Sequence, residues 1–182
     1  MSHSLDTLSL QSFSAETVSG STVTSHPALS WYNVSAEVKS LLQLAAAHWE
    51  DTQTSADYIN QALEKAGDNP DVLVSAYRYF FYKRNDPLAL QVAQKVLHLV
   101  RTSEQLPEAW EQLYPILTSR REESTIRLYL SAYSASGLIL ARLGAVAQAR
   151  EIANQVSAID GKEFGGDVIL NILNAPPDED EE

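Results

Sequence analysis

The 182-residue chain contains no cysteine, and this absence removes several kinds of chemistry at once. Without thiols there is no disulfide, no thiolate metal site and no cysteine nucleophile. Proline and glycine are scarce too, at seven residues each, which is too few for a fibrous or wholly disordered chain. No run approaches the roughly 18 apolar residues that a membrane-spanning helix requires. The composition therefore predicts a globular protein outside the membrane, and the lack of cysteine fits a reducing compartment.

Basic residues are also scarce. The chain has 13 lysines and arginines against 24 acidic residues, which gives a net charge of −11. A general nucleic-acid binder has to neutralise phosphates with clustered basic side chains, so this class of function is disfavoured. The first basic residue is Lys39, and the positively charged start of a signal or transit peptide is therefore missing. We expect a cytoplasmic protein.

Three segments of the chain differ in composition. Residues 1–34 are rich in serine and threonine, carry two charged side chains and show no sustained helical period. So little apolar surface cannot offset the entropy cost of ordering, which predicts a flexible arm. Residues 35–175 form the predicted helical-repeat domain, and residues 176–182 predict a disordered acidic tail. One alternative for the arm is that an apolar stripe docks on a groove of the protein itself or on a partner; the stripe consists of Leu5, Leu8, Leu10 and Phe13.

Apolar and small residues recur at fixed spacing in three helical stretches. The first stretch has Ser55, Ile59 and Ala62. The second stretch has Ala89, Ala93 and Val96 at the corresponding places, 34 positions later. The third stretch has Ala149, Ala153 and Val156, another 60 positions later. A period of 34 residues in helical sequence is typical of tetratricopeptide-type hairpins, in which each unit buries its apolar face on its neighbours.

Helical periodicity, with capping residues and breakers between the periodic stretches, predicts eight helices. They span 35–50, 54–66, 71–84, 87–101, an inserted helix within 106–120, and then 123–143, 145–158 and 162–174. Gly67 is expected to close the second helix as a C-cap residue. Pro115 falls within the inserted helix and predicts either a kink or two short pieces.

The third hairpin resembles the tetratricopeptide repeat, whose units have small residues at set positions and a glycine at the turn. With Leu130 as position one, Gly137 stands at position eight, Gly144 at the turn and Ala149 at position twenty. The second hairpin departs from this pattern with a bulky Tyr77 at position eight. The resemblance covers roughly residues 36–160. It implies an all-α, right-handed stack of three hairpins, with one inserted helix between the second and third and a C-terminal capping helix.

In that family, the first helix of each hairpin lines a concave groove that binds a partner. The resemblance assigns partner binding here to His48, Val74, Arg78, Phe81, Tyr82, Ser134, Leu138 and Arg142. Arginines beside aromatic rings suit a peptide that carries an acidic residue and an apolar anchor. The aromatic run within 76–84 has two interpretations: it packs two helix faces into the core, or it leaves Tyr79 or Tyr82 partly exposed as an anchor.

The sequence contains no recognisable set of catalytic residues. The histidines lack metal-ligand spacing, and the glycine-rich phosphate-binding motifs are missing. We therefore expect no enzyme, no cofactor and no metal. The expected function is that of an adaptor or assembly chaperone that binds another protein or a peptide segment, but neither nucleic acid nor membrane. Two alternatives are an acidic secretion chaperone of the type III kind, which the chain resembles in size, charge and N-terminal arm, and a structural subunit of a larger complex. The sequence does not fix the oligomeric state.

Overall fold

A computed structural model describes residues 34–176, and within that range the chain is helical and contains no strand. This confirms the all-α prediction. The predictions of a flexible arm and a disordered tail fall, apart from Val34 and Pro176, outside the described residues. The eight helices of this range are α2 (Ala36–Ala47), α3 (Thr52–Ala66), α4 (Pro70–Tyr82), α5 (Asp86–Ser103), α6 (Trp110–Ser119), α7 (Ser124–Arg142), α8 (Val146–Asp160) and α9 (Gly166–Asn174).

Polar side chains fix the starts of the first four helices. Each accepts a hydrogen bond from a backbone N–H of the first turn, which has no partner within the helix. The four capping residues are Ser35, Asp51, Asn69 and Asn85. Pro70 and Pro87 follow two of these caps, in the first turn, where a missing N–H costs nothing. Local sequence therefore specifies where each of these helices begins.

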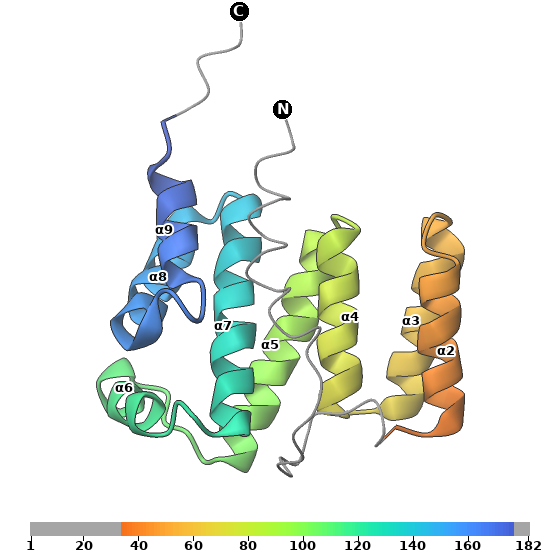
Figure 1. Cartoon of the computed structure of the whole chain (residues 1–182), viewed down its shortest axis with the longest axis horizontal. Helices are drawn as coiled ribbons and strands as arrows, with labels where there is room; N and C mark the ends of the chain where they lie inside the picture. Colours follow the sequence, from red (N-terminus) through yellow and green to blue (C-terminus); the bar gives the residue numbers. More distant parts are fainter. Residues whose placement is uncertain (1–33, 177–182) are drawn as a thin grey trace, which may run out of the picture.

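Consecutive helices pack as antiparallel pairs, α2 with α3, α4 with α5 and α7 with α8 (Figure 1). The pairs follow chain order along the longest axis, from α2–α3 at one end to α8 and α9 at the other. Their internal turns, residues 48–51, 83–85 and 143–145, lie at one edge of the molecule, which is the upper edge in Figure 1. Helix α6 lies at the opposite edge, near the start of α7 and beside α8. None of the helices between residues 34 and 176 combines the length and apolarity needed to cross a membrane.

The nine repeated positions of the sequence occupy equivalent places on α3, α5 and α8. Every one of them is at most 3% exposed. The first member of each set, Ser55, Ala89 or Ala149, donates its backbone N–H to the carbonyl of the residue that caps its helix, at 2.9–3.0 Å. Ser55 also donates its hydroxyl to the Ala45 carbonyl of α2 at 2.6 Å. The repeat in the sequence is therefore a repeat in structural register, with small residues where paired helices meet.

Glycines act at the third hairpin as the sequence predicts. A Cβ on Gly137 would lie 2.9 Å from Ile152 Cγ2 of α8 and 3.3 Å from Ile169 Cδ1 of α9, so only glycine allows this approach. Gly144 has a φ of +81°, which a side chain would disfavour, and it reverses the chain between α7 and α8. Gly67 ends α3 and donates its N–H to the Leu63 carbonyl at 3.1 Å.

One alternative for the inserted helix and one predicted boundary are wrong. Helix α6 lies within the predicted range 106–120 and continues through Pro115, so the alternative of two short pieces is wrong. Leu113 and Leu117 bury the turns on both sides of the proline against the same core. Helix α9 begins at Gly166, four residues later than predicted. Gly165 adopts a left-handed conformation there, with φ of +80°, and so stands outside the helix.

Candidate partner-binding surface

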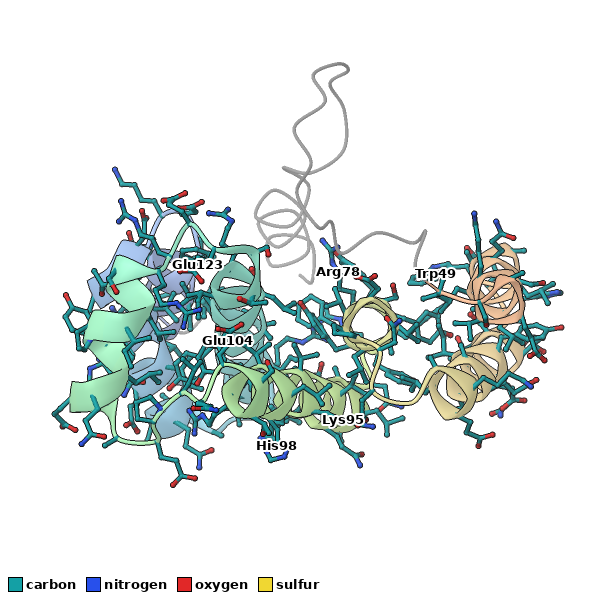
Figure 2. The ribbon with its side chains drawn as sticks, turned by 90° about the horizontal axis from the view of Figure 1, so that it is seen from below. Trp49, Arg78, Lys95, His98, Glu104 and Glu123 are labelled. Atoms are coloured by element: carbon teal, nitrogen blue, oxygen red, sulfur yellow. The ribbon has the colours of Figure 1, made fainter. Side chains whose placement is uncertain are left out.

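A hollow lies between the second half of α4 and the middle of α7, and we call it the α4–α7 hollow. It is lined by Tyr77, Arg78, Phe81, Tyr82 and Ala135. Tyr77 and Phe81 are buried and form its floor, whereas Tyr82 is 38% exposed. Figure 2 shows Arg78 projecting from α4 on one side of the molecule, while Lys95 and His98 project from α5 on the opposite side. Three of the five lining residues are among those predicted to bind a partner.

The aromatic run of α4 serves two faces of the helix. Tyr79 is 6% exposed, and its ring meets the ring of Trp49 edge to face, with centroids 5.3 Å apart. Phe80 is buried as well. The rings of Phe81 and Tyr82 lie 5.6 Å apart, almost perpendicular, on the side of the hollow. Of the two anchors that the sequence offered, Tyr82 is therefore exposed and Tyr79 is packed inside.

Arg142 is already engaged within the protein. Its Nη2 lies 2.8 Å from Asp86 Oδ1 and donates to the Phe81 carbonyl at 3.2 Å. Its guanidinium sits 4.2 Å from the centroid of the Phe81 ring. The two charged side chains are only 13% and 14% exposed. Arg142 thus ties the end of α7 to the end of α4 and the start of α5, and it holds Phe81 in place beneath the hollow.

The junction between the first two hairpins repeats this arrangement. Lys83, directly after α4, places its Nζ 4.1 Å from the centroid of the Trp49 ring and donates to the Trp49 carbonyl. In both junctions a cation at the end of one hairpin's first helix lies on an aromatic ring at the end of the preceding first helix. A cation over an aromatic face is stabilising, more so when partly buried. The same contact therefore joins hairpins one and two and hairpins two and three.

The remaining predicted residues lie in different surroundings. Val74 and Leu138 are half-buried and pack on the core, one turn before Arg78 and Arg142 respectively. Ser134 is buried, and a Cβ on Gly165 would lie 3.5 Å from its hydroxyl, so Ser134 faces the start of α9. His48 is exposed, and its ring lies 5.6 Å from that of Tyr58 on α3. Their binding roles stay predictions, and the structure does not bring His48 or Ser134 to the hollow.

Two lining residues, Tyr77 and Ala135, are absent from the predicted set. Tyr77 occupies the eighth position of the second hairpin, where the third hairpin has Gly137. The buried ring of Tyr77 contributes to the floor of the hollow. The departure from the repeat pattern was therefore the signal that could have added Tyr77 to the predicted set.

Exposed apolar side chains gather at the edge that carries the three turns. Five of the seven large hydrophobic residues that are exposed within residues 34–176 lie in or beside these turns. They are Trp49, Tyr82, Leu88, Leu143 and Val146, each 36–45% exposed. Tyr82 belongs to this edge and also to the α4–α7 hollow, so the hollow opens toward an apolar rim.

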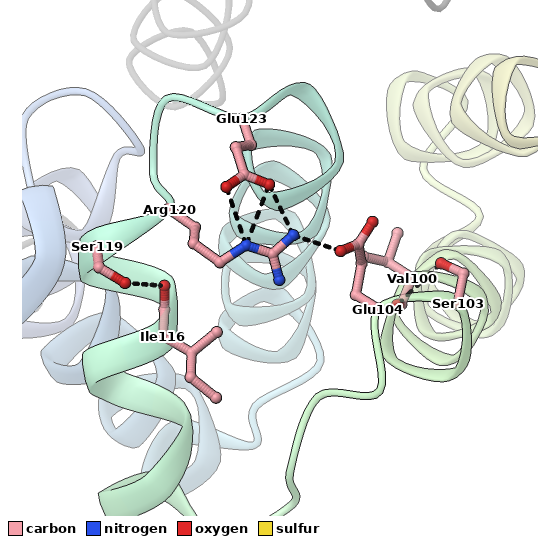
Figure 3. Close-up of polar contacts among 7 residues, drawn as sticks. All are labelled: Val100, Ser103, Glu104, Ile116, Ser119, Arg120 and Glu123. Atoms are coloured by element: carbon pink, nitrogen blue, oxygen red, sulfur yellow. Dashed lines mark hydrogen bonds and ion pairs between the residues drawn. The ribbon is translucent and has the colours of Figure 1, made fainter.

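Helix α6 presents a second exposed aromatic surface, and an ionic cluster fixes the end of this helix (Figure 3). Arg120 donates through Nε to both carboxylate oxygens of Glu123, at 3.0 and 3.1 Å, and through Nη2 to Glu104. We call these three residues the Arg120 clamp. The hydrogen bonds from Arg120 lower the pKa of both glutamates. Tyr114 of α6 is 38% exposed, its ring lies 5.5 Å from that of Trp110, and its hydroxyl donates to the Ala158 carbonyl of α8 at 3.4 Å.

Within residues 34–176, no three histidine, aspartate or glutamate side chains are placed to hold a metal ion together. The assembled features are an aromatic hollow with one arginine on its wall, an apolar rim and the aromatic face of α6. Such surfaces can bury apolar side chains of another molecule and pair with an acidic one.

Comparison with known proteins shows that the chain is similar to a curated protein. That protein is an uncharacterized 19.8 kDa protein in the nifW 5′ region of Azotobacter chroococcum mcd 1, 27% identical over 124 residues. The aligned part covers 66% of this chain and 70% of that protein. No family model matches the chain, and no solved structure matches it. The name of the relative gives the position of its gene and no binding partner.

Proposed function

We propose that this protein is an adaptor or assembly chaperone that binds a segment of another protein at the α4–α7 hollow. The observation that carries the proposal is Tyr82, an aromatic side chain left 38% exposed beside a floor of buried rings. Aromatic and arginine side chains are enriched where binding energy concentrates in interfaces. An apolar side chain of a partner would pack over this shallow hollow, against the exposed ring of Tyr82.

We propose further that the architecture is a divergent tetratricopeptide stack. The pairs α2–α3, α4–α5 and α7–α8 would be its three hairpins in a right-handed arrangement, with α6 inserted and α9 as the cap. Support comes from the equivalent burial of the nine repeated positions and from the same cation–ring contact at both hairpin junctions. In such a stack the first helices, including α4 and α7, line the binding face.

The chemistry of the hollow defines the partner segment. An apolar side chain would pack between Tyr77, Phe81 and Tyr82, and an acidic residue nearby would accept hydrogen bonds from Arg78. The role is one of binding, without catalysis, cofactor, nucleic acid or membrane, and we place it in the cytoplasm. The whole chain has a net charge of −11, which disfavours strongly acidic partners. We therefore expect few acidic residues in the bound segment.

Two tyrosines provide a matched test, since Tyr82 in the hollow and Tyr114 on α6 are both 38% exposed. Tyr82→Asp and Tyr114→Asp would be used as baits in affinity capture from the native cell, with quantitative mass spectrometry against the wild-type chain. We expect Tyr82→Asp to lose the partner at least tenfold while melting stays within a few degrees of wild type. Retention of the partner by Tyr82→Asp and its loss by Tyr114→Asp would move the site to α6.

The aromatic pair of half-buried Trp110 and exposed Tyr114 favours one alternative, a structural subunit joined to a larger complex through α6. In that case the captured proteins would form one fixed assembly, and Tyr114→Asp would release it. The capture of a single unfolded, exported client that depends on Tyr82 would instead indicate a secretion chaperone of the type III kind.

A further inference from the structure

The kind of segment that fits the α4–α7 hollow occurs within this chain itself. An apolar anchor next to an acidic residue is what the aromatic floor and Arg78 would accept. Residues 5–13 read LDTLSLQSF, with Asp6 among the apolar side chains. The apolar residues of this segment are Leu5, Leu8, Leu10 and Phe13.

We propose that residues 5–13 bind the α4–α7 hollow of the same molecule, and that a partner has to displace them. The inference deepens the proposed function, on which it rests for the existence of a competing partner. It makes binding conditional, because a client segment gains access only when it outcompetes the arm or when the arm is held elsewhere.

The length of the intervening chain suits this contact. About 20 residues separate Phe13 from Val34, which lies two positions before the first residue of α2. Packed helices lie roughly 8–10 Å apart, so the hollow is about 30 Å from the start of α2 once the length of α4 is included. A coil of about 20 residues has a root-mean-square span of roughly 25 Å and a maximum near 70 Å. A linker whose span matches the distance gives an effective concentration in the millimolar range.

Charge also favours residues 5–13 as the occupant. The segment 1–33 contains two acidic residues and no lysine or arginine, whereas the hollow has the cationic side chain of Arg78 in its lining. The tail 178–182 is more acidic but offers no apolar side chain, so it cannot fill an aromatic hollow. Only the N-terminal segment combines both kinds of group.

The absence of cysteine allows a direct test on the full-length chain. Ser9→Cys would introduce a single thiol for a nitroxide spin label, and the label would broaden the amide signals of nearby residues. We expect strong broadening at residues 77–82 and 135, independent of protein concentration, and none at His98 on the opposite face (Figure 2). Uniform or absent broadening would overturn the proposal. Broadening that grows with concentration would do so as well, because it would show the arm of a second copy.

A matched variant keeps the charge and removes the anchors, with Leu5→Ser, Leu8→Ser, Leu10→Ser and Phe13→Ser made together. A fluorescent peptide of residues 1–20 should bind this variant at least tenfold more tightly than the wild-type chain, in which the tethered arm competes. Equal affinities, or no binding to either protein, would contradict occupation in cis. Tyr82→Asp introduced into the variant should abolish binding of the peptide.

The two proposals fail separately. If a partner is lost with Tyr82→Asp but the spin label does not broaden residues 77–82, the arm proposal is wrong and the adaptor function stands. If the label broadens these residues but even the variant lacking the anchors captures nothing through Tyr82, the arm contact stands and the adaptor function is wrong.

Discussion

Replacing Arg142 by methionine should destabilise the protein substantially. Breaking a buried ion pair by removing one partner costs about 3–5 kcal/mol, because the other charge is left buried. Arg142 and Asp86 keep 13% and 14% of their side-chain surface exposed, so water relieves part of this penalty. The contact with the Phe81 ring is lost as well, at about 1–2 kcal/mol. We expect a net loss of about 2–4 kcal/mol, which lowers the Tm by roughly 5–15 °C for a chain of this size.

Urea and thermal unfolding, followed by circular dichroism at 222 nm, would measure this loss. The control is Arg121→Met, which removes an arginine whose ion pair with Glu122 is 44% and 78% exposed. Exposed pairs contribute about 0–1 kcal/mol, so the control should remain close to wild type. A double-mutant cycle with Asp86→Ala should give a coupling of roughly 1–3 kcal/mol. If Arg142→Met is no more destabilising than Arg121→Met, the assignment of Arg142 as an internal tie between hairpins is wrong.

Two further predictions concern the third hairpin and the inserted helix. Gly137→Ala should lower the Tm although alanine favours helix, because its Cβ would lie 2.9 Å from Ile152 Cγ2 and overpacking costs about 1–3 kcal/mol; an increase in Tm would show that α7 and α8 can separate freely. For the Arg120 clamp, the pKa of both glutamates lies below the ordinary 4.5 in the folded protein. Its stabilisation is therefore present above pH 4.5 and is lost as the pH falls through the lowered values. The Tm difference between wild type and Arg120→Gln should shrink below pH 4.5, and a constant difference down to pH 3 would refute this.

The repeat register was accessible from the sequence because it depends on local requirements. A helix that meets its partner closely needs small residues every few positions, and those residues recur at fixed spacing. Ala89, Ala93 and Ala153 are fully buried for this reason. The roles of Gly137 and Gly144 could likewise be predicted from single positions, since a close approach of two helices and a positive φ each demand glycine.

The side-chain contacts around the candidate site could not be predicted from the sequence in the same way. Arg142 and Asp86 are 56 positions apart, and nothing in either local sequence indicates that their side chains meet. The repeat pattern placed Arg142 on the groove, but the direction of its side chain depends on how α7 packs against α4 and α5. Ser134 illustrates the same difficulty: one position of register separates it from Ala135, which lines the hollow. On a helix, neighbouring positions point about 100° apart, so a site prediction needs the helix rotation as well as its boundaries.

The continuity of α6 has a tertiary cause as well. Pro115 removes one backbone hydrogen bond, which a sequence argument treats as a break. Leu113 and Leu117, on either side of the proline, are 3% and 0% exposed and bury both turns together. Their burial outweighs a single missing bond in the middle of a ten-residue helix.

The central claim is that a partner binds at the α4–α7 hollow, and site-specific photo-crosslinking in the native cell tests it most directly. A benzophenone side chain would replace Tyr82 in one full-length variant and Tyr114 in another, because both tyrosines are 38% exposed and they lie on different surfaces. The account predicts a covalent adduct with another protein from position 82 and none from position 114. An adduct from position 114 together with none from position 82 would contradict it.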